Sequence, residues 1–317
     1  MRYDTPTWSS TTQHSQRNME EEGDSHIENA VKHWCDSGLA EHSSVAGFSK
    51  VLVGLVNVNA PSIILRASQN AALDEIKHAK LCFGLANAIR SLGSSKKNDG
   101  RVLSPGPLPV KTSLKVHTSL DQVAGASAAE GCVEETLSSF LAAVALDMLP
   151  ESDSSKYIPK IGNKVSFVLN HITRDESRHA SLAWYTVRWC LEEERKHLDG
   201  KTGVVHKSVR EAFAKAFENV VGEKQEKLEE EVHDSSLWPY GILSANTEHY
   251  ITRIITREVL KPWAIALLNF RPLPEVKISL VVDPRNSNVH TNRVLNTIRS
   301  MEMNADLLNL DAKFSDE

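Results

Sequence analysis

The sequence has few cysteines, no long apolar run and no marked excess of one charge. Its four cysteines lie far apart and form no Cys-x-x-Cys pair, so we expect neither a disulfide framework nor a zinc or rubredoxin-type site. No apolar stretch approaches the ~20 residues of a membrane span. A net charge of -5 gives no reason for a general attraction to nucleic acid or to an anionic membrane. Together these absences favour a reducing, cytoplasmic setting.

What the sequence does contain is helical periodicity over most of its length. Apolar positions spaced three and four apart predict long helices at about 24–59, 61–92, 119–149 and 159–196. The proline- and serine-containing stretch 94–118 predicts a long connection between the second helix and the third. The pattern therefore predicts an all-α fold, with a four-helix bundle over residues 24–200 and a long crossover between its two helix pairs.

The segments outside this bundle are predicted separately. Residues 1–23 are rich in Ser, Thr, Gln and charge, which is typical of a disordered leader. Residues 201–270 predict a C-terminal helical extension, whose last helix is kinked or broken at Pro262. The tail, residues 271–317, carries no pattern that predicts a structure.

One seven-residue frame occurs twice, as Leu-Asp-Glu-Ile-Lys-His-Ala at 73–79 and as Arg-Asp-Glu-Ser-Arg-His-Ala at 174–180. Residues three apart share a face of a helix, so each copy offers one carboxylate and one imidazole to the same point. The aspartate lies four residues before the histidine and is placed to accept its second N–H. The predicted ligands are Glu75, His78, Glu176 and His179, and the predicted hydrogen-bonding aspartates are Asp74 and Asp175.

The other two bundle helices each carry an acid inside the apolar stripe, Glu41 in the first and Glu130 in the third. Four carboxylates facing one another in a core would repel and take up protons, and two divalent cations would remove that conflict. Oxygen donors with one imidazole per ion favour iron or manganese over zinc. Glu134 is either a seventh ligand or a neighbouring hydrogen-bonding group, while Glu135 is expected to point elsewhere.

Residues 28–191 resemble the ferritin-like di-iron carboxylate superfamily. The stretches Ala-Glu-His-Ser-Ser-Val-Ala at 40–46, Ala-Leu-Asp-Glu-Ile-Lys-His-Ala at 72–79 and Glu-Gly-Cys at 130–132 are similar to those of microbial ferritin-like domain proteins. The layout is also similar to the tRNA-hydroxylase branch. The resemblance implies that Glu41 and Glu130 are terminal or bridging carboxylates and that the full set holds two iron ions, with manganese as the other metal compatible with these donors.

The resemblance implies an oxidoreductase that activates dioxygen, most directly an oxygenase or hydroxylase acting on an unidentified substrate with an electron donor. A ferroxidase or iron-storage protein of ferritin type is the first alternative, although ferritin subunits are typically shorter. A peroxide reductase of rubrerythrin type is disfavoured because the rubredoxin site is absent, and a metal-free interaction scaffold is the last alternative. No membrane partner and no general nucleic-acid surface are expected, and a homodimer remains open.

Overall fold

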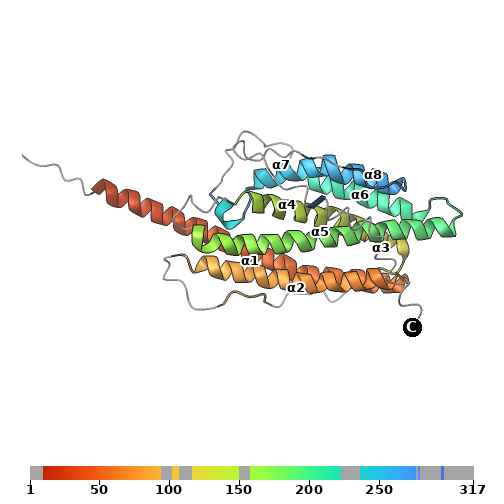
Figure 1. The fold of residues 1–317 in the computed structure, drawn as a ribbon, viewed down its shortest axis with the longest axis horizontal. Helices are drawn as coiled ribbons and strands as arrows, with labels where there is room; N and C mark the ends of the chain where they lie inside the picture. The colour runs from red at the N-terminus through yellow and green to blue at the C-terminus, as the bar shows by residue number, and fades with distance from the viewer. Residues whose placement is uncertain are drawn as a thin grey trace, which may run out of the picture.

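A computed structural model describes residues 10–93, 102–106, 116–149, 158–222, 236–275, 278 and 294–295. Every regular element among these residues is helical, which confirms the all-α prediction (Figure 1). No helix in these ranges combines the length and the apolar character needed to cross a bilayer. The tail that follows residue 275 lies almost wholly outside the described residues.

Long helices form the part of the molecule that the sequence predicts as a bundle. They are α1 (Ser10–Asn57), α2 (Ser62–Arg90), α3 (Leu120–Ala126), η1 (Ser127–Glu135), α4 (Thr136–Asp147) and α5 (Ile158–His197). The three middle elements follow one another without a break, so the predicted third helix is one rod with a π-helical centre, η1. The first helix begins at Ser10, ahead of the predicted start at Asp24, and so takes in much of the segment predicted as a leader.

The connection from α2 to α3 joins opposite ends of the helical layers (Figure 1). Toward its middle, the backbone N–H of Leu103 donates to Oδ1 of Asn87, and its carbonyl accepts from Nδ2 of the same side chain, both at 2.9 Å. At its end the carbonyl of His117 accepts a hydrogen bond from Nδ2 of Asn57, at the end of α1, at 3.1 Å. Because α2 ends at one end of the helical layers and α3 begins at the other, α2 runs parallel to the α3–η1–α4 rod. It runs antiparallel to α5 (Figure 1).

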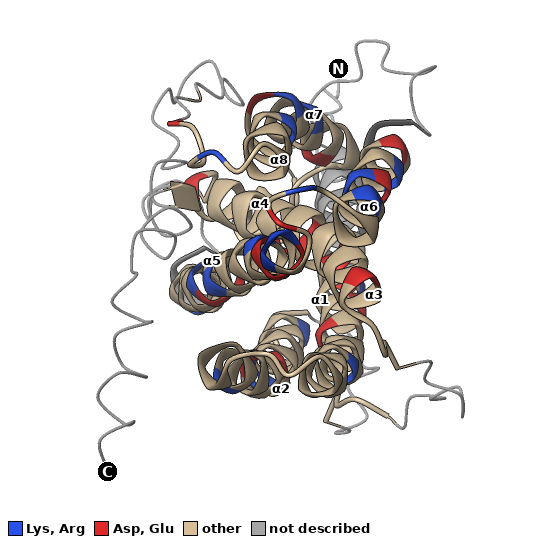
Figure 2. Ribbon diagram, turned by 90° about the vertical axis from the view of Figure 1, so that its right-hand side faces the viewer, with Lys and Arg blue, Asp and Glu red and all other residues tan. Residues whose placement is uncertain are grey.

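The helices after residue 200 pack against the α3–η1–α4 rod and α5, on the side that faces away from α2 (Figure 2). They are α6 (Val204–Gly222), the 3-10 turn η2 (Trp238–Tyr240), α7 (Ala245–Ile255), η3 (Thr256–Leu260) and α8 (Lys261–Leu268). The last three form one continuous helix. The interruption predicted at Pro262 takes the form of the π-helical turn η3 just before it, where the missing proline N–H changes the hydrogen-bond register.

Trp184 of α5 joins this extension to the long helices. Its ring stacks on Phe213 of α6 and meets Trp263 of α8 edge to face, with ring centroids 5.6 Å apart in both pairs. Its Nε1–H donates to Oγ1 of Thr136 on α4 at 3.2 Å, which satisfies the polar end of a fully enclosed side chain. The described extension and the long helices therefore share one hydrophobic core.

Glu194, near the end of α5, fixes the turn into α6. Its buried carboxylate accepts the backbone N–H groups of Gly203 at 2.9 Å, Val205 at 2.6 Å and His206 at 3.0 Å. The N–H groups at the start of a helix have no partner within the helix, and a negative charge there is favoured by the helix dipole. One side chain thus completes the start of α6 and holds it against α5.

We expect Glu194→Ala to lower the free energy of unfolding by about 2–3 kcal/mol, because these backbone donors lose a charged acceptor. Glu193→Ala is the matched control. It removes only a pair with the exposed Lys196, at 2.7 Å, and is expected to cost less than ~1 kcal/mol. Urea unfolding followed by circular dichroism measures both losses, and equal losses would contradict the role given to Glu194.

Candidate metal centre

Two groups of acidic and histidine side chains meet between α1, α2, η1 and α5. Within each group the candidate donor atoms all lie within 4.8 Å of one another. The first group is Glu41, Glu75, His78 and Glu176, and the second is Glu75, Glu135, Glu176 and His179. The glutamates of the repeated frame belong to both groups, so the groups are joined along a shared pair of carboxylates.

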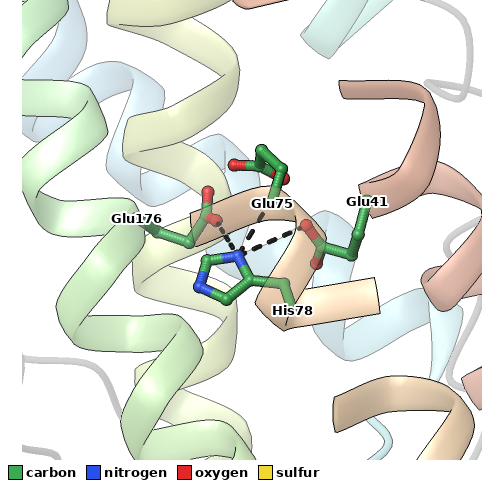
Figure 3. A group of neighbouring side chains, drawn as sticks. All are labelled: Glu41, Glu75, His78 and Glu176. Carbon is green, nitrogen blue, oxygen red and sulfur yellow. Dashed lines mark ion pairs between the residues drawn. The ribbon is translucent and has the colours of Figure 1, made fainter. Parts of the chain in front are cut away.

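In the first group, Nδ1 of His78 faces three carboxylates (Figure 3). It lies 3.2 Å from Oε1 of Glu176, 3.5 Å from Oε2 of Glu41 and 3.9 Å from Oε2 of Glu75. The imidazole is fully buried, and within the described part of the chain Nδ1 forms no hydrogen bond of acceptable geometry. Nδ1 of His78 thus points at three carboxylates without a hydrogen bond to any of them. This is the arrangement expected of side chains that share a metal ion.

The second group repeats this geometry. Nδ1 of His179 lies 3.1 Å from Oε1 of Glu75, 3.7 Å from Oε1 of Glu176 and 3.8 Å from Oε2 of Glu135. Each histidine is therefore closer to the glutamate of the opposite copy than to the one on its own helix. Two copies of one frame on antiparallel helices produce this approximate twofold relation.

The aspartates also pair across the two helices. Nε2 of His78 donates to Oδ2 of Asp175 at 3.3 Å, and Nε2 of His179 lies 3.5 Å from Oδ2 of Asp74. The predicted pairing of each aspartate with the histidine four residues later is therefore wrong. The side chains of α2 and α5 project into the space between the helices, where antiparallel packing places each aspartate opposite the other copy's histidine.

Arg178 links the two aspartates, donating from Nη2 to Oδ2 of Asp74 at 2.9 Å and to Oδ1 of Asp175 at 2.8 Å. Burial opposes ionisation of Asp175, but hydrogen bonds from His78 and Arg174 and the charge of Arg178 hold its pKa well below the usual value. An ionised carboxylate only accepts hydrogen bonds. Asp175 therefore keeps a proton on Nε2 of His78, which directs Nδ1 toward the glutamates.

The side chains of the centre carry an excess of negative charge, which raises the pKa values of several of them. Burial disfavours a charged imidazole, but the hydrogen bond to Asp175 and the neighbouring carboxylates of Glu176 and Glu41 outweigh it and raise the pKa of His78 to about 11. Burial, reinforced by Glu41 and Glu176, raises the pKa of Glu75 to about 8. Protons on these groups supply the positive charge that metal cations would otherwise bring, and a bound cation must displace them.

The donor set fits metal ions. Nδ1 of both histidines and Oε1 of Glu176 are buried and form no hydrogen bond among the described residues, so each is available to a cation. Four carboxylates balance the charge of two divalent ions, and the mixture of oxygen and imidazole donors suits iron or manganese. These buried residues are thus able to hold metal.

Glu135 takes the place predicted for Glu130. An α-helical period puts Glu130 and Glu134 on the inward face, but η1 has the wider π-helical register, which turns Glu135 toward the second group. Both Glu130 and Glu134 are exposed and belong to neither group, so the expected roles of Glu130 as a ligand and Glu134 as a seventh ligand are not what the geometry shows.

Two signals in the sequence could have pointed to Glu135. A run of acids, Glu130, Glu134 and Glu135, leaves the inward residue ambiguous by one position. In addition, Gly131 sits inside a helix, where a Cβ would lie 2.4 Å from Cβ of Ala183 on α5. A side chain at this position would collide with α5, so a glycine within the predicted helix indicates close helix packing beside the acidic run.

No protein-family model, no curated protein and no solved structure matches this chain. Assignment to a family therefore depends on the repeated frame and on the geometry of the centre. The class of site that these define is a buried carboxylate–histidine cluster able to bind metal.

The π-helical register makes a direct prediction. We expect Glu135→Gln to weaken binding of Mn(II) by about tenfold or more, because it removes a charged donor from the second group. Glu130→Gln, on the same helix, is expected to change the affinity by less than about twofold. Calorimetric Mn(II) titration measures both, and a stronger effect at Glu130 would restore the α-helical prediction.

The cross-helix aspartate makes a second prediction. Asp175→Asn is expected to weaken Mn(II) binding by about 10- to 100-fold, because an amide no longer holds the imidazole of His78 by a charged acceptor. Asp74→Asn, whose contact with His179 is longer at 3.5 Å, is expected to have the smaller effect. The same titration compares them, with circular dichroism to check folding; a larger loss at Asp74 would contradict this order.

Proposed function

We propose that this protein is a ferritin-like di-iron oxidoreductase that activates dioxygen, of the oxygenase or hydroxylase type. One observation carries the proposal: two four-residue groups share Glu75 and Glu176, and each adds one inward imidazole nitrogen. One Glu from each of two helices with Glu-x-x-His from each of the other two is the ligand pattern of di-iron and di-manganese bundles. Glu41 and Glu135 are the two single glutamates in this chain.

The arrangement of the helices supports the same class. α1, α2, the α3–η1–α4 rod and α5 each contribute at least one residue to the centre. α2 ends at one end of the helical layers and α3 begins at the other, as the helices before and after the single long crossover of a ferritin-like bundle do (Figure 1).

Bound iron would supply the redox chemistry toward dioxygen. The residues of the chain then have three tasks. Glu41, Glu75, Glu135 and Glu176 provide charge and oxygen donors. Asp175 orients His78 through a hydrogen bond to Nε2, and Asp74 lies 3.5 Å from Nε2 of His179. Phe48 packs its ring edge to face against His179, with centroids 5.0 Å apart, and limits the access of water to that ligand.

A cavity beside the centre favours an oxygenase over an iron store. It has a volume of about 170 Å³ and is lined in part by Glu135 and His179, so its contents would lie next to the second group. Space of this kind serves an organic substrate, which iron storage does not need.

Anaerobic Fe(II) titration tests the proposal. We expect about two Fe(II) per chain, with both lost in Glu75→Ala because that carboxylate serves both groups. Glu41→Ala, which alters the first group alone, is expected to retain one. Circular dichroism controls for folding, and unchanged loading in Glu75→Ala would exclude the assignment.

Gel filtration and oxygen uptake separate the two activities. A monomer or dimer that consumes dioxygen only with a reductant and an organic substrate fits an oxygenase. A large shell that takes up many Fe(II) per chain would assign iron storage instead.

A further inference from the structure

The side chains that line the cavity beside the second group determine which molecules it can bind. Its volume of about 170 Å³ is close to that of an engineered cavity of ~150 Å³ that binds benzene, so it has room for about six to eight non-hydrogen atoms. Phe48, Val51 and Leu182 give it an apolar wall. No lysine or arginine is among the described residues that line it, which leaves a bound anion without a partner.

Two carboxylates line the cavity without serving the metal centre. Glu130 and Glu134 are exposed, so they stand at the mouth, and neither forms a hydrogen bond or an ion pair within the described part of the chain. The four carboxylates of the two groups already balance two divalent cations, and among the described residues no lysine or arginine lines the cavity to pair with Glu130 and Glu134.

A buried hydroxyl provides an independent sign of a ligand. Ser68 of α2 lines the same cavity, is 1% exposed, and its Oγ has no hydrogen-bond partner among the described residues. An unpaired buried polar group costs free energy, and such groups occur where a ligand or water completes them. Within the part of the chain that the structure describes, the cavity therefore presents a hydroxyl without a partner inside and two carboxylates without a partner at its mouth.

We infer that this cavity binds a small primary or secondary amine with an apolar body, its ammonium group paired with Glu130 and Glu134 and its body against Phe48, Val51 and Leu182. That this amine is the substrate rests on the proposed function, because only that function makes the neighbouring centre reactive. Binding itself depends on the cavity and its two carboxylates alone.

Cyclohexylamine and cyclohexanol test the inference, because they have nearly the same shape and differ in charge. Calorimetry with Mn(II)-loaded and with metal-free protein is expected to show cyclohexylamine bound at least about tenfold more tightly. The double variant Glu130→Gln/Glu134→Gln is expected to reduce this preference to less than about twofold. Equal binding of the two compounds by the unaltered protein, or an unchanged preference in the double variant, would overturn the inference.

A matched pair of glycine variants tests the location. A Cβ at Gly47, which lines the cavity, or at Gly84, which lies outside it on α2, would meet nothing within 4 Å. A leucine side chain at either position therefore starts in open space, and leucine favours a helix over glycine. We expect Gly47→Leu to abolish binding of cyclohexylamine and Gly84→Leu to leave it unchanged; binding retained in Gly47→Leu would place the site elsewhere.

Metal loading of the same samples separates this inference from the proposed function. Normal Mn(II) loading without amine binding overturns the inference alone. Amine binding that is lost in the double variant, in a protein that takes up no metal, overturns the proposed function and supports the cavity. Loss of Mn(II) from the double variant would identify Glu130 and Glu134 as ligands and overturn the inference.

Discussion

The repulsion between four carboxylates in one buried cluster is the constraint on which the rest of the structure depends. Removing an ionised group from water costs several kcal/mol, and adjacent like charges add to that cost. This repulsion is offset by successive layers of side chains whose charges alternate in sign. Two imidazoles lie among the glutamates, Asp74 and Asp175 lie behind the imidazoles, and Arg174 and Arg178 lie behind the aspartates. Metal cations would complete this alternation at its centre.

This charge arrangement depends on fixed positions of the helices. α5 contacts both the centre and the C-terminal extension. One part of its surface carries Glu176 and His179, while Trp184 packs against α6 and α8. Glu194 then ties the end of the same helix to the start of α6. The extension after residue 200 therefore acts on the centre indirectly, by fixing the helix that supplies half of the repeated frame.

Sequence periodicity was sufficient for the long helices and for most of the centre. Glu41, Glu75, His78, Glu176 and His179 interrupt apolar stripes on helices with regular geometry, so an α-helical period places them together. Glu135 could not be placed in this way, because η1 has a π-helical register that an α-helical period does not describe. The exchange of aspartate partners likewise depends on the relative direction of α2 and α5, and no spacing within one helix contains it.

Arg178 contacts both aspartates, and this has a mechanical consequence for the centre. One residue of an α-helix advances it by ~1.5 Å, so even a slide of α5 past α2 by one position would break the contacts of this guanidinium. Because the helices are antiparallel, such a slide displaces both aspartate–histidine pairs by the same amount. The two halves of the centre are therefore locked in a single register and loosen together. Glu41 and Glu135 come from outside this helix pair, so their positions do not depend on that register.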